Sequence, residues 1–189
     1  MVLEASMKRI EDLINRSLTE VRLRVQPELH AELSQLLNIV DQIVVTAEVE
    51  ARSRDQTLEI QIEQNLVFEA DQQLIFSALS NLIQNALKYT HSGGKIQIRG
   101  SERGENIVIE VGDECGGVLS KNSNELFKPF EQQHENKKGL GLGLSIAQRA
   151  ITLNNGLIEA KNSPGKGCIF TITLPKKAAI ARSEVTPAA

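Results

Sequence analysis

The chain has 189 residues, of which 41% are hydrophobic, and a formal net charge of -3 at pH 7. This length suits one domain with a short extra element, and the hydrophobic content is sufficient for a packed core. The absence of a basic excess argues against nucleic-acid binding through phosphate contacts, so no nucleic-acid partner is expected.

Several further functional classes are disfavoured by the sequence. No apolar run approaches the ~20 residues of a membrane-spanning helix, and Glu4 brings charge too early for a signal peptide. The two cysteines, Cys115 and Cys168, are too few for a disulfide framework and lack the spacing of a metal motif. These features predict a reducing, cytoplasmic location.

Two helices are predicted in the first quarter of the chain. Residues 3–25 carry apolar side chains at three- and four-residue steps, which is typical of an amphipathic helix. A second helix is predicted from Ala31 to Arg52. One face of it would carry Leu33, Leu36, Leu37, Val40, Val44 and Ala47.

The central part alternates between strands and a helix. Apolar residues alternate with polar ones over Thr57–Glu63, which predicts a half-buried strand, and the apolar stretch 66–68 predicts another. Asp71 is a suitable N-cap for a helix that continues to Tyr89. A turn over His91–Gly94 follows.

The last part is predicted to be rich in strands. Strands are expected over 95–99 and 106–111, joined by residues 100–104, and a loop-rich segment over 113–138. A helix should begin near Leu142 and end at 154–156. A hairpin of 157–160 and 168–174 should follow, turning at 163–165. This order predicts a two-layer α/β sandwich rather than a doubly wound parallel sheet.

The helix over 71–89 carries an unusual polar stripe. Asn81, Asn85, Lys88 and Tyr89 lie at offsets of zero, four, seven and eight residues, so they share one face. A carboxamide oxygen can ligate Mg²⁺, and a nearby lysine can hold phosphate oxygens. The alternative interpretation is an ordinary polar helix face.

Two loop motifs follow. Asp113 comes directly after a strand and precedes Gly116 and Gly117, so it could accept a hydrogen bond from an exocyclic amine while the glycines admit a flat ring. An ordinary Asp-Gly turn is the alternative. Phe127 and Phe130 could pin a loop at two points, or they could form a satellite hydrophobic cluster.

A glycine-leucine run leads into the last helix. Its glycines permit unusual backbone angles, and a helix N-terminus attracts phosphate. No Gly-Lys-Ser/Thr follows, so this is not a Walker loop, and the run departs from the dinucleotide fingerprint because no strand leads directly into it. The run comprises Gly139, Leu140, Gly141, Leu142, Gly143 and Leu144.

Taken in this order, the motifs resemble the ATP-binding catalytic domain of a sensor histidine kinase. This domain belongs to the GHKL, or Bergerat-fold, superfamily, which includes gyrase and the heat-shock chaperone and mismatch-repair ATPases. The resemblance covers roughly residues 35–175. It implies an α+β two-layer sandwich, with a mixed sheet packed against helices, an ATP lid and an N-terminal amphipathic helix.

The resemblance also implies roles for individual residues, with ATP and Mg²⁺ as cofactors. Asn85 would ligate Mg²⁺, and Asn81, Lys88 and Tyr89 would contact the phosphates or the ribose. Asp113 would bind the adenine amine, with Gly117 beside the ring. Phe127 and Phe130 would anchor the lid. The run would close on the phosphates through Gly139, Leu140, Gly141, Leu142, Gly143 and Leu144.

Position 81 bears on the reaction class. Hydrolytic members of the superfamily carry a glutamate where this chain has Asn81, and a carboxamide is no general base. The resemblance therefore implies that ATP is held for transfer, which depends mainly on positioning and charge neutralisation.

Cys115 replaces a glycine of the family's motif. It is expected to be packed and inert, without loss of nucleotide binding.

A phosphoacceptor histidine, which the family places before an acidic residue on an upstream helix, is not recognised. His30 precedes Ala31 and His91 precedes Ser92, whereas His134 does precede Glu135 but falls in the expected lid. Residues 1–30 resemble the end of the second dimerisation helix and its linker, 31–176 the catalytic domain, and 177–189 a frayed tail.

The expected partners follow from this division. They are the parent kinase's phosphoacceptor domain, a response regulator, and a second copy of the chain through the N-terminal helix. A cytoplasmic location would also suit the cytoplasmic part of a membrane-bound sensor. An anti-sigma-type serine kinase and a degenerate nucleotide-sensing module remain as alternatives.

Overall fold

The computed structural model describes residues 29–117, 123–129, 141–163 and 166–177. The helix expected over 3–25 and the tail from residue 178 onward lie outside the described residues. Within the described part, no helix combines the length and the hydrophobicity needed to span a membrane.

A five-stranded mixed sheet forms one layer. Its order is β2-β4-β5-β7-β6; β2 runs parallel to β4, and the other neighbours are antiparallel. A separate antiparallel pair joins β1 to β3. The strands are β1 (Ala31–Gln35), β2 (Thr57–Ile62), β3 (Val67–Asp71), β4 (Lys95–Arg103), β5 (Asn106–Gly112), β6 (Leu157–Ser163) and β7 (Gly167–Pro175).

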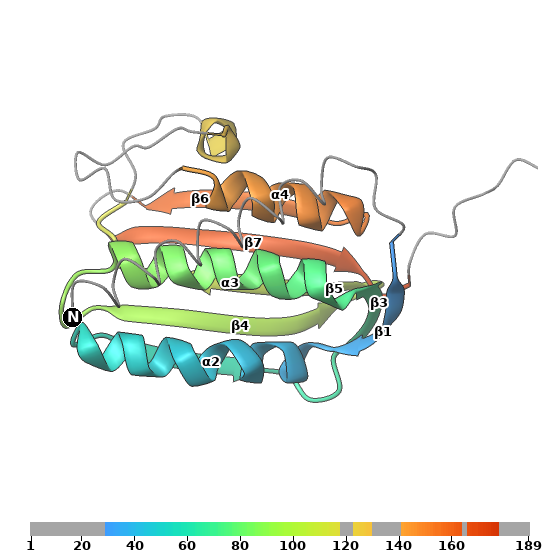
Figure 1. The fold of residues 1–189 in the computed structure, drawn as a ribbon, viewed down its shortest axis with the longest axis horizontal. Coiled ribbons are helices and arrows are strands. Elements are labelled where there is room, and N and C mark those ends of the chain that lie inside the picture. The colour runs from blue at the N-terminus through green and yellow to red at the C-terminus, as the bar shows by residue number, and fades with distance from the viewer. Residues whose placement is uncertain (1–28, 118–122, 130–140, 164–165, 178–189) are drawn as a thin grey trace, which may run out of the picture.

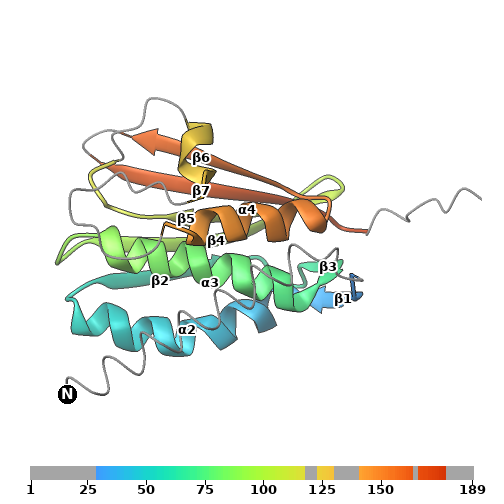
Figure 2. The same ribbon diagram turned by 45° about the horizontal axis from the view of Figure 1, so that its top comes forward.

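Three helices form the second layer and cover one face of this sheet (Figures 1 and 2). They are α2 (Leu36–Ser53), α3 (Gln72–Tyr89) and α4 (Gly143–Leu153). On β4, buried Ile96 and Ile98 alternate with the more exposed Lys95 and Gln97, so one side of the strand meets the helices and the other does not. The predicted two-layer sandwich with a mixed sheet is therefore confirmed.

The expected helix over Ala31–Arg52 begins too early. Residues 31–35 are strand β1, and α2 begins at Leu36. Leu33, expected on the buried face, is 73% exposed. Residues 31–35 form a strand because they pair with β3. The spacing of apolar residues within the segment carries no information about a partner so distant in the sequence. The buried positions of α2 are Leu36, Ile39, Val40, Ile43, Ala47 and Ala51.

Strand β4 is longer than expected, because Gly100 lies inside it rather than in the connection. A β-carbon at Gly100 would lie 2.6 Å from a methyl carbon of Leu36, so this glycine allows the sheet and the start of α2 to pack closely. The turn is instead formed by Gly104 and Glu105, and Gly104 takes the left-handed φ of +61°.

Helix α3 begins as predicted. The Asp71 carboxylate accepts a hydrogen bond of 3.1 Å from the Leu74 N–H, which satisfies one free donor of the first turn. At the other end, buried Gln56 donates from Nε2 to the carbonyls of Leu87 and Thr90 at 3.1 and 2.5 Å. Both ends of the helix are therefore fixed by side chains.

Asn154 joins α4 to α3. Its Oδ1 accepts a hydrogen bond of 2.7 Å from the Asp71 N–H, and its Nδ2 donates to the Ala150 carbonyl at 2.8 Å. The side chain is buried, with 6% of the residue exposed. This one carboxamide thus links the last turn of α4 to the N-cap of α3.

Replacement of Asn154 by alanine is expected to reduce the free energy of unfolding by about 1–3 kcal/mol, because a buried N–H and a helix carbonyl lose their partner. Urea denaturation measures the change. Asn38→Ala, at an exposed position of α2, is the matched control and should change stability by less than about 0.5 kcal/mol. Equal effects of the two substitutions would contradict the proposed link.

Candidate functional site

The polar stripe of α3 lies beside the first residue of α4. Asn81 donates from Nδ2 to the Ser77 carbonyl at 2.9 Å. A β-carbon on Gly143 would lie 3.0 Å from Asn81 Oδ1 and 3.8 Å from Asn85 Nδ2. The fold therefore brings both asparagines next to the N-terminus of α4, as the order of the motifs suggested.

In the described part of the glycine-leucine run, leucines that pack against the core alternate with glycines. Leu142 is buried and Leu144 packs against the core. Gly141 adopts a left-handed φ of +70°. The leucines therefore fix the entry into α4, while Gly143 brings the backbone close to α3. Gly139 and Leu140 lie outside the described residues.

Lys88 and Tyr89 form a pair in the last turn of α3. The Lys88 ammonium donates a 2.7 Å hydrogen bond to the Tyr89 hydroxyl and lies 4.4 Å from the ring centroid. Both side chains are half-buried and belong to the same face as the asparagines. This places one positive charge where an anion bound at the helix could reach it.

Asp113 is held at the end of β5 by the backbone of two other segments. Its Oδ1 accepts hydrogen bonds from the N–H groups of Cys115 at 3.1 Å and Cys168 at 3.0 Å. Its own N–H donates to the Cys168 carbonyl at 2.9 Å. Both backbone donors use Oδ1, so Oδ2 can accept a further hydrogen bond from an amine.

Three glycines shape the backbone around Asp113. Gly116 and Gly117 have φ values of +78° and +89°, which side-chain-bearing residues rarely adopt. A β-carbon on Gly167 would overlap the Asp113 carbonyl oxygen. Sequence analysis missed Gly167, although its position directly before a predicted strand and after Lys166 was a turn signal.

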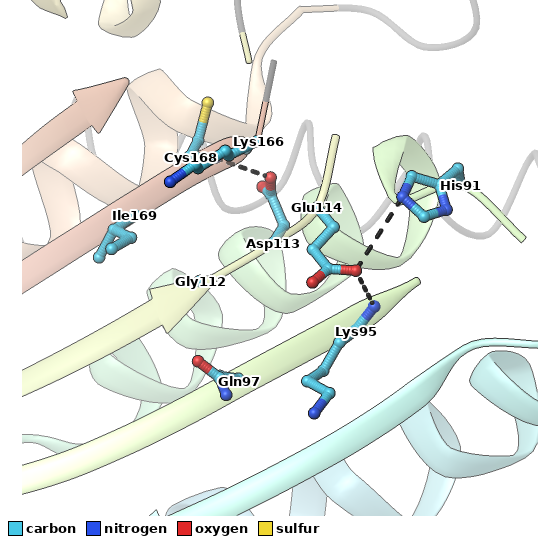
Figure 3. Close-up of a pocket in the computed structure, with 10 residues that line it drawn as sticks. His91, Lys95, Gln97, Gly112, Asp113, Glu114, Lys166, Cys168 and Ile169 are labelled. Carbon is cyan, nitrogen blue, oxygen red and sulfur yellow. Dashed lines mark hydrogen bonds and ion pairs between the residues drawn. The ribbon is translucent and has the colours of Figure 1, made fainter. Parts of the chain in front are cut away.

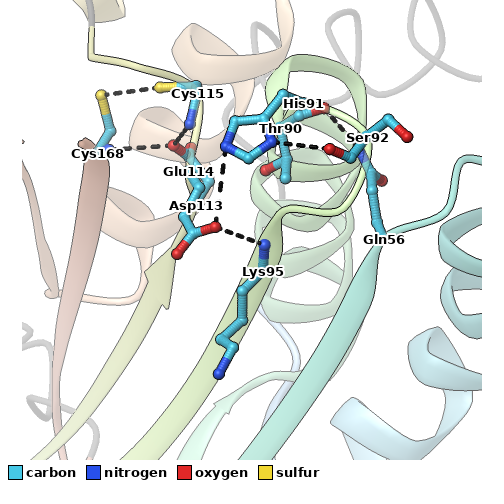
Figure 4. A network of polar contacts seen from close by, with 9 residues as sticks. All are labelled: Gln56, Thr90, His91, Ser92, Lys95, Asp113, Glu114, Cys115 and Cys168. Atoms are coloured by element: carbon cyan, nitrogen blue, oxygen red, sulfur yellow. Dashed lines mark hydrogen bonds and ion pairs between the residues drawn. The ribbon is translucent and has the colours of Figure 1, made fainter. Parts of the chain in front are cut away.

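The thiols of Cys115 and Cys168 meet beside Asp113 (Figure 4). The Cys115 thiol donates to Cys168 Sγ at 3.5 Å. This hydrogen bond, together with burial and the nearby Asp113 carboxylate, raises the pKa of the Cys115 thiol. Cys115 is therefore protonated at neutral pH, which fits the expectation of a packed, unreactive thiol.

Glu114 ties this loop to the turn after α3. Its Oε2 accepts a hydrogen bond of 2.9 Å from the Lys95 N–H and lies 4.0 Å from His91 Nε2. Figure 4 shows Asp113 and Glu114 beside Thr90 and His91, the residues that directly follow α3, so Asp113 lies near the C-terminal end of this helix. The expected adenine contact and the expected phosphate contacts are thus brought to one end of the sheet.

A pocket of about 510 Å³ opens at this end of the sheet (Figure 3). Its walls include Lys95 and Gln97, whose side chains lie on the sheet face away from the helices. None of Asn81, Asn85 or Gly143 lines it. Asp113 and Glu114 do line it, so the pocket is adjacent to the expected adenine contact rather than to the asparagines.

The first of the two expected lid anchors is packed into the core. Phe127 ends the short 3-10 helix η1 (Ser123–Phe127) and is 5% exposed. Its ring meets that of Phe170 on β7 edge to face, with centroids 6.4 Å apart. Phe130, the second expected anchor, lies outside the described residues.

Substitution of Gly167 by alanine should displace the Asp113 loop, because the added methyl group overlaps its backbone. The expected cost is about 1–3 kcal/mol of unfolding free energy, with a weaker affinity for adenine nucleotides. Melting temperature and calorimetric titration measure the two effects. Gly112→Ala is the control, since its methyl group meets nothing nearer than 3.8 Å. The steric argument would be wrong if Gly167→Ala had the same melting temperature and the same nucleotide affinity as Gly112→Ala.

Comparisons with known proteins identify a matching family and several similar kinases. The family described as histidine kinase-, DNA gyrase B-, and HSP90-like ATPase matches residues 70–178, more than half of the chain. The alginate biosynthesis sensor protein KinB of Pseudomonas aeruginosa is 34% identical over 92 residues, which are 49% of this chain and 16% of KinB. The sensor histidine kinase CpxA of Escherichia coli is 28% identical over 178 residues, which are 92% of this chain and 38% of CpxA.

Solved histidine kinases share the fold. The kinase AdeS of Acinetobacter baumannii aligns with a TM-score of 0.71 at 28% identity, over 92% of this chain and 80% of that one. Full-length ShkA in complex with AMPPNP aligns with a TM-score of 0.81 at 23% identity, over 94% of this chain and 38% of that one. The chain therefore belongs to the histidine kinase-, DNA gyrase B-, and HSP90-like ATPase family, and within it to the ATP-binding catalytic domains of sensor histidine kinases.

Proposed function

We propose that this domain binds Mg-ATP and holds its γ-phosphoryl group for transfer to a histidine on another part of the kinase. The observation that carries the proposal is the position of Gly143 beside Asn81 and Asn85. This position brings the N-terminal, positive end of the α4 dipole next to two carboxamides, an arrangement that suits a triphosphate and its cation.

Each residue of the site has a role in this proposal. Asn85 ligates Mg²⁺ through its carboxamide oxygen, while phosphate oxygens and water complete the shell, as this small hard cation prefers. Asn81, Lys88 and Tyr89 contact the phosphates or the ribose. The glycine-leucine run contributes backbone N–H groups toward the phosphates from Gly139, Leu140, Gly141, Leu142, Gly143 and Leu144.

The adenine base would be bound at the end of β5. Asp113 Oδ2 accepts the hydrogen bond of the exocyclic amine, while Oδ1 is retained by the backbone of Cys115 and Cys168. Gly117 lies beside the ring, and its lack of a side chain leaves room for it. A carboxylate fixed by two N–H groups selects an amine donor over a carbonyl acceptor at this position.

Transfer rather than hydrolysis follows from the residue at position 81. The Asn81 carboxamide contacts Ser77 and lies beside Gly143, and it cannot take a proton from water. The site then contributes positioning and charge neutralisation, and the acceptor must supply the nucleophile.

We place the acceptor and the remaining partners outside residues 31–176, which form the catalytic domain. His91 contacts the Ser92 carbonyl and Glu114 in the turn after α3, and no acidic residue follows it. Residues 1–30 would be the end of a dimerisation helix and pair with a second copy. Histidine kinase ThkA has been solved with the response regulator TrrA, and a cytoplasmic response regulator is likewise the downstream partner proposed here.

Removal of the Asn85 carboxamide tests whether this residue binds Mg²⁺. Asn85→Ala should weaken the binding of a non-hydrolysable ATP analogue by about tenfold, or about 1.4 kcal/mol, and should abolish its dependence on Mg²⁺. Calorimetric titration with and without Mg²⁺ measures both. Gln84→Ala, at an exposed position of the same helix, is the control and should behave as the unaltered protein. Unchanged affinity without Mg²⁺ dependence would favour a degenerate nucleotide-sensing module.

Autophosphorylation tests the assignment of the acceptor. After incubation with Mg²⁺ and γ-³²P-labelled ATP, the chain should carry no acid-labile, base-stable label, because none of its three histidines is in an acceptor context. Label that is lost in His30→Ala, His91→Ala or His134→Ala would identify an acceptor within the chain and contradict the proposal.

A further inference from the structure

The two cysteines of the chain are 53 residues apart in sequence and meet in the fold. Their Sγ atoms are 3.5 Å apart. With a carboxylate oxygen of Asp113 they form a group of three potential metal ligands whose atoms all lie within 4.8 Å of one another. The group joins the end of β5 to the start of β7, as Figure 4 shows.

We propose that Asp113, Cys115 and Cys168 bind a borderline-soft divalent cation of the Zn²⁺ class. Zn–S bonds are about 2.3 Å long and structural sites are tetrahedral, so two sulfurs on one ion lie about 3.8 Å apart. The observed 3.5 Å needs an adjustment of a few tenths of an ångström. A disulfide would require the sulfurs to close to about 2.0 Å, a much larger movement.

Backbone contacts already position the ligands, whereas the thiol hydrogen bonds from Cys115 to Cys168 and from Cys168 to Asn162 Oδ1 would be replaced by bonds to the ion. Cys168 is 2% exposed and belongs to strand β7, which pairs on both sides. Backbone N–H groups of both cysteines fix the Asp113 carboxylate through Oδ1, and one carboxylate oxygen lies within 4.8 Å of both sulfurs. Cys115 and Asp113 are only half-buried, so an ion can enter from their side, and a water molecule can fill the fourth position.

Binding is a proton exchange without a change of oxidation state. Each thiol releases its proton to solvent as its sulfur bonds to the cation, so one divalent ion replaces two protons. Thiolates favour Zn²⁺ over Mg²⁺, whereas the carboxamide of Asn85 favours the harder ion. The two cation sites therefore select different metals.

One consequence rests on the proposed function. An ion bound to the Asp113 carboxylate would neutralise the acceptor and lie where the adenine amine is proposed to bind. A Zn²⁺-class ion at this site should therefore compete with ATP, although it lies at the base end of the nucleotide rather than at the phosphates.

Cobalt binding tests the metal site directly. Co²⁺ is added to the chain in a non-thiol reductant, and the thiolate-to-cobalt absorption is followed. We expect one equivalent of Co²⁺ to produce the band, one equivalent of Zn²⁺ to remove it, and both Cys115→Ser and Cys168→Ser to lack it. No band in the unaltered chain, or a band that survives either substitution, would overturn the site.

Folding is checked independently. Circular dichroism of both serine variants should match that of the unaltered chain, and Cys168→Ala provides a second variant if the buried hydroxyl of Cys168→Ser disturbs the core. Native mass spectrometry of the Zn²⁺-treated chain should show one bound ion and no disulfide. A disulfide in place of the metal adduct would overturn the proposal.

Competition with nucleotide is measured separately. One equivalent of Zn²⁺ should raise the apparent Kd of a non-hydrolysable ATP analogue by tenfold or more in the unaltered chain. It should leave the Kd of Cys115→Ser unchanged, which controls for Zn²⁺ bound by the nucleotide itself. A chain that binds cobalt but no nucleotide would disprove the proposed function alone. Zn²⁺ binding without any effect on nucleotide affinity would overturn the shared use of Asp113.

Discussion

The close approach of α4 to α3 is the constraint on which the site depends. A β-carbon at position 143 would lie 3.0 Å from Asn81 Oδ1, so glycine allows the first turn of α4 to lie beside the two asparagines without displacing that side chain. Buried Leu142 prevents the turn from moving away, and Asn154 fixes the other end of α4 to the start of α3. The geometry of the phosphate end therefore follows from helix packing rather than from loop conformation.

The adenine end depends on strand pairing instead. Asp113 continues the line of hydrogen bonds between β5 and β7, and Gly167 admits its carbonyl at the point where β7 begins. Because Oδ1 is occupied by backbone donors, the carboxylate cannot rotate freely. A rigid acceptor at one end and the proposed cation site at the other would suit a ligand that must be held in one orientation.

Sequence alone could identify the features whose signals are local. The Asp71 cap, the asparagine stripe of α3 and the entry into α4 all depend on neighbours within a few residues, and the structure has them as expected. Strand β1 was missed because its partners in β3 are distant in sequence: Gln35 pairs with Val67, 32 residues on, and Ala31 with Asp71, 40 residues on. The spacing of Leu33 and Leu36 also fits a helix. The links made by Asn154 and Gly167 were missed for the same reason. The cysteine spacing likewise predicted no metal motif, yet the two thiols meet.

The candidate site takes its parts from α3, α4 and the loop after β5, so it exists only when the whole sheet and both helices are assembled. An unfolded chain offers no such arrangement, and every ligand of the site therefore binds the folded state alone. At a free concentration one hundred times its Kd, a ligand of this kind adds about 2.7 kcal/mol to the free energy of unfolding. The lifetime of the domain against unfolding and proteolysis would thus follow the nucleotide supply of the cell, quite apart from any phosphate that it transfers.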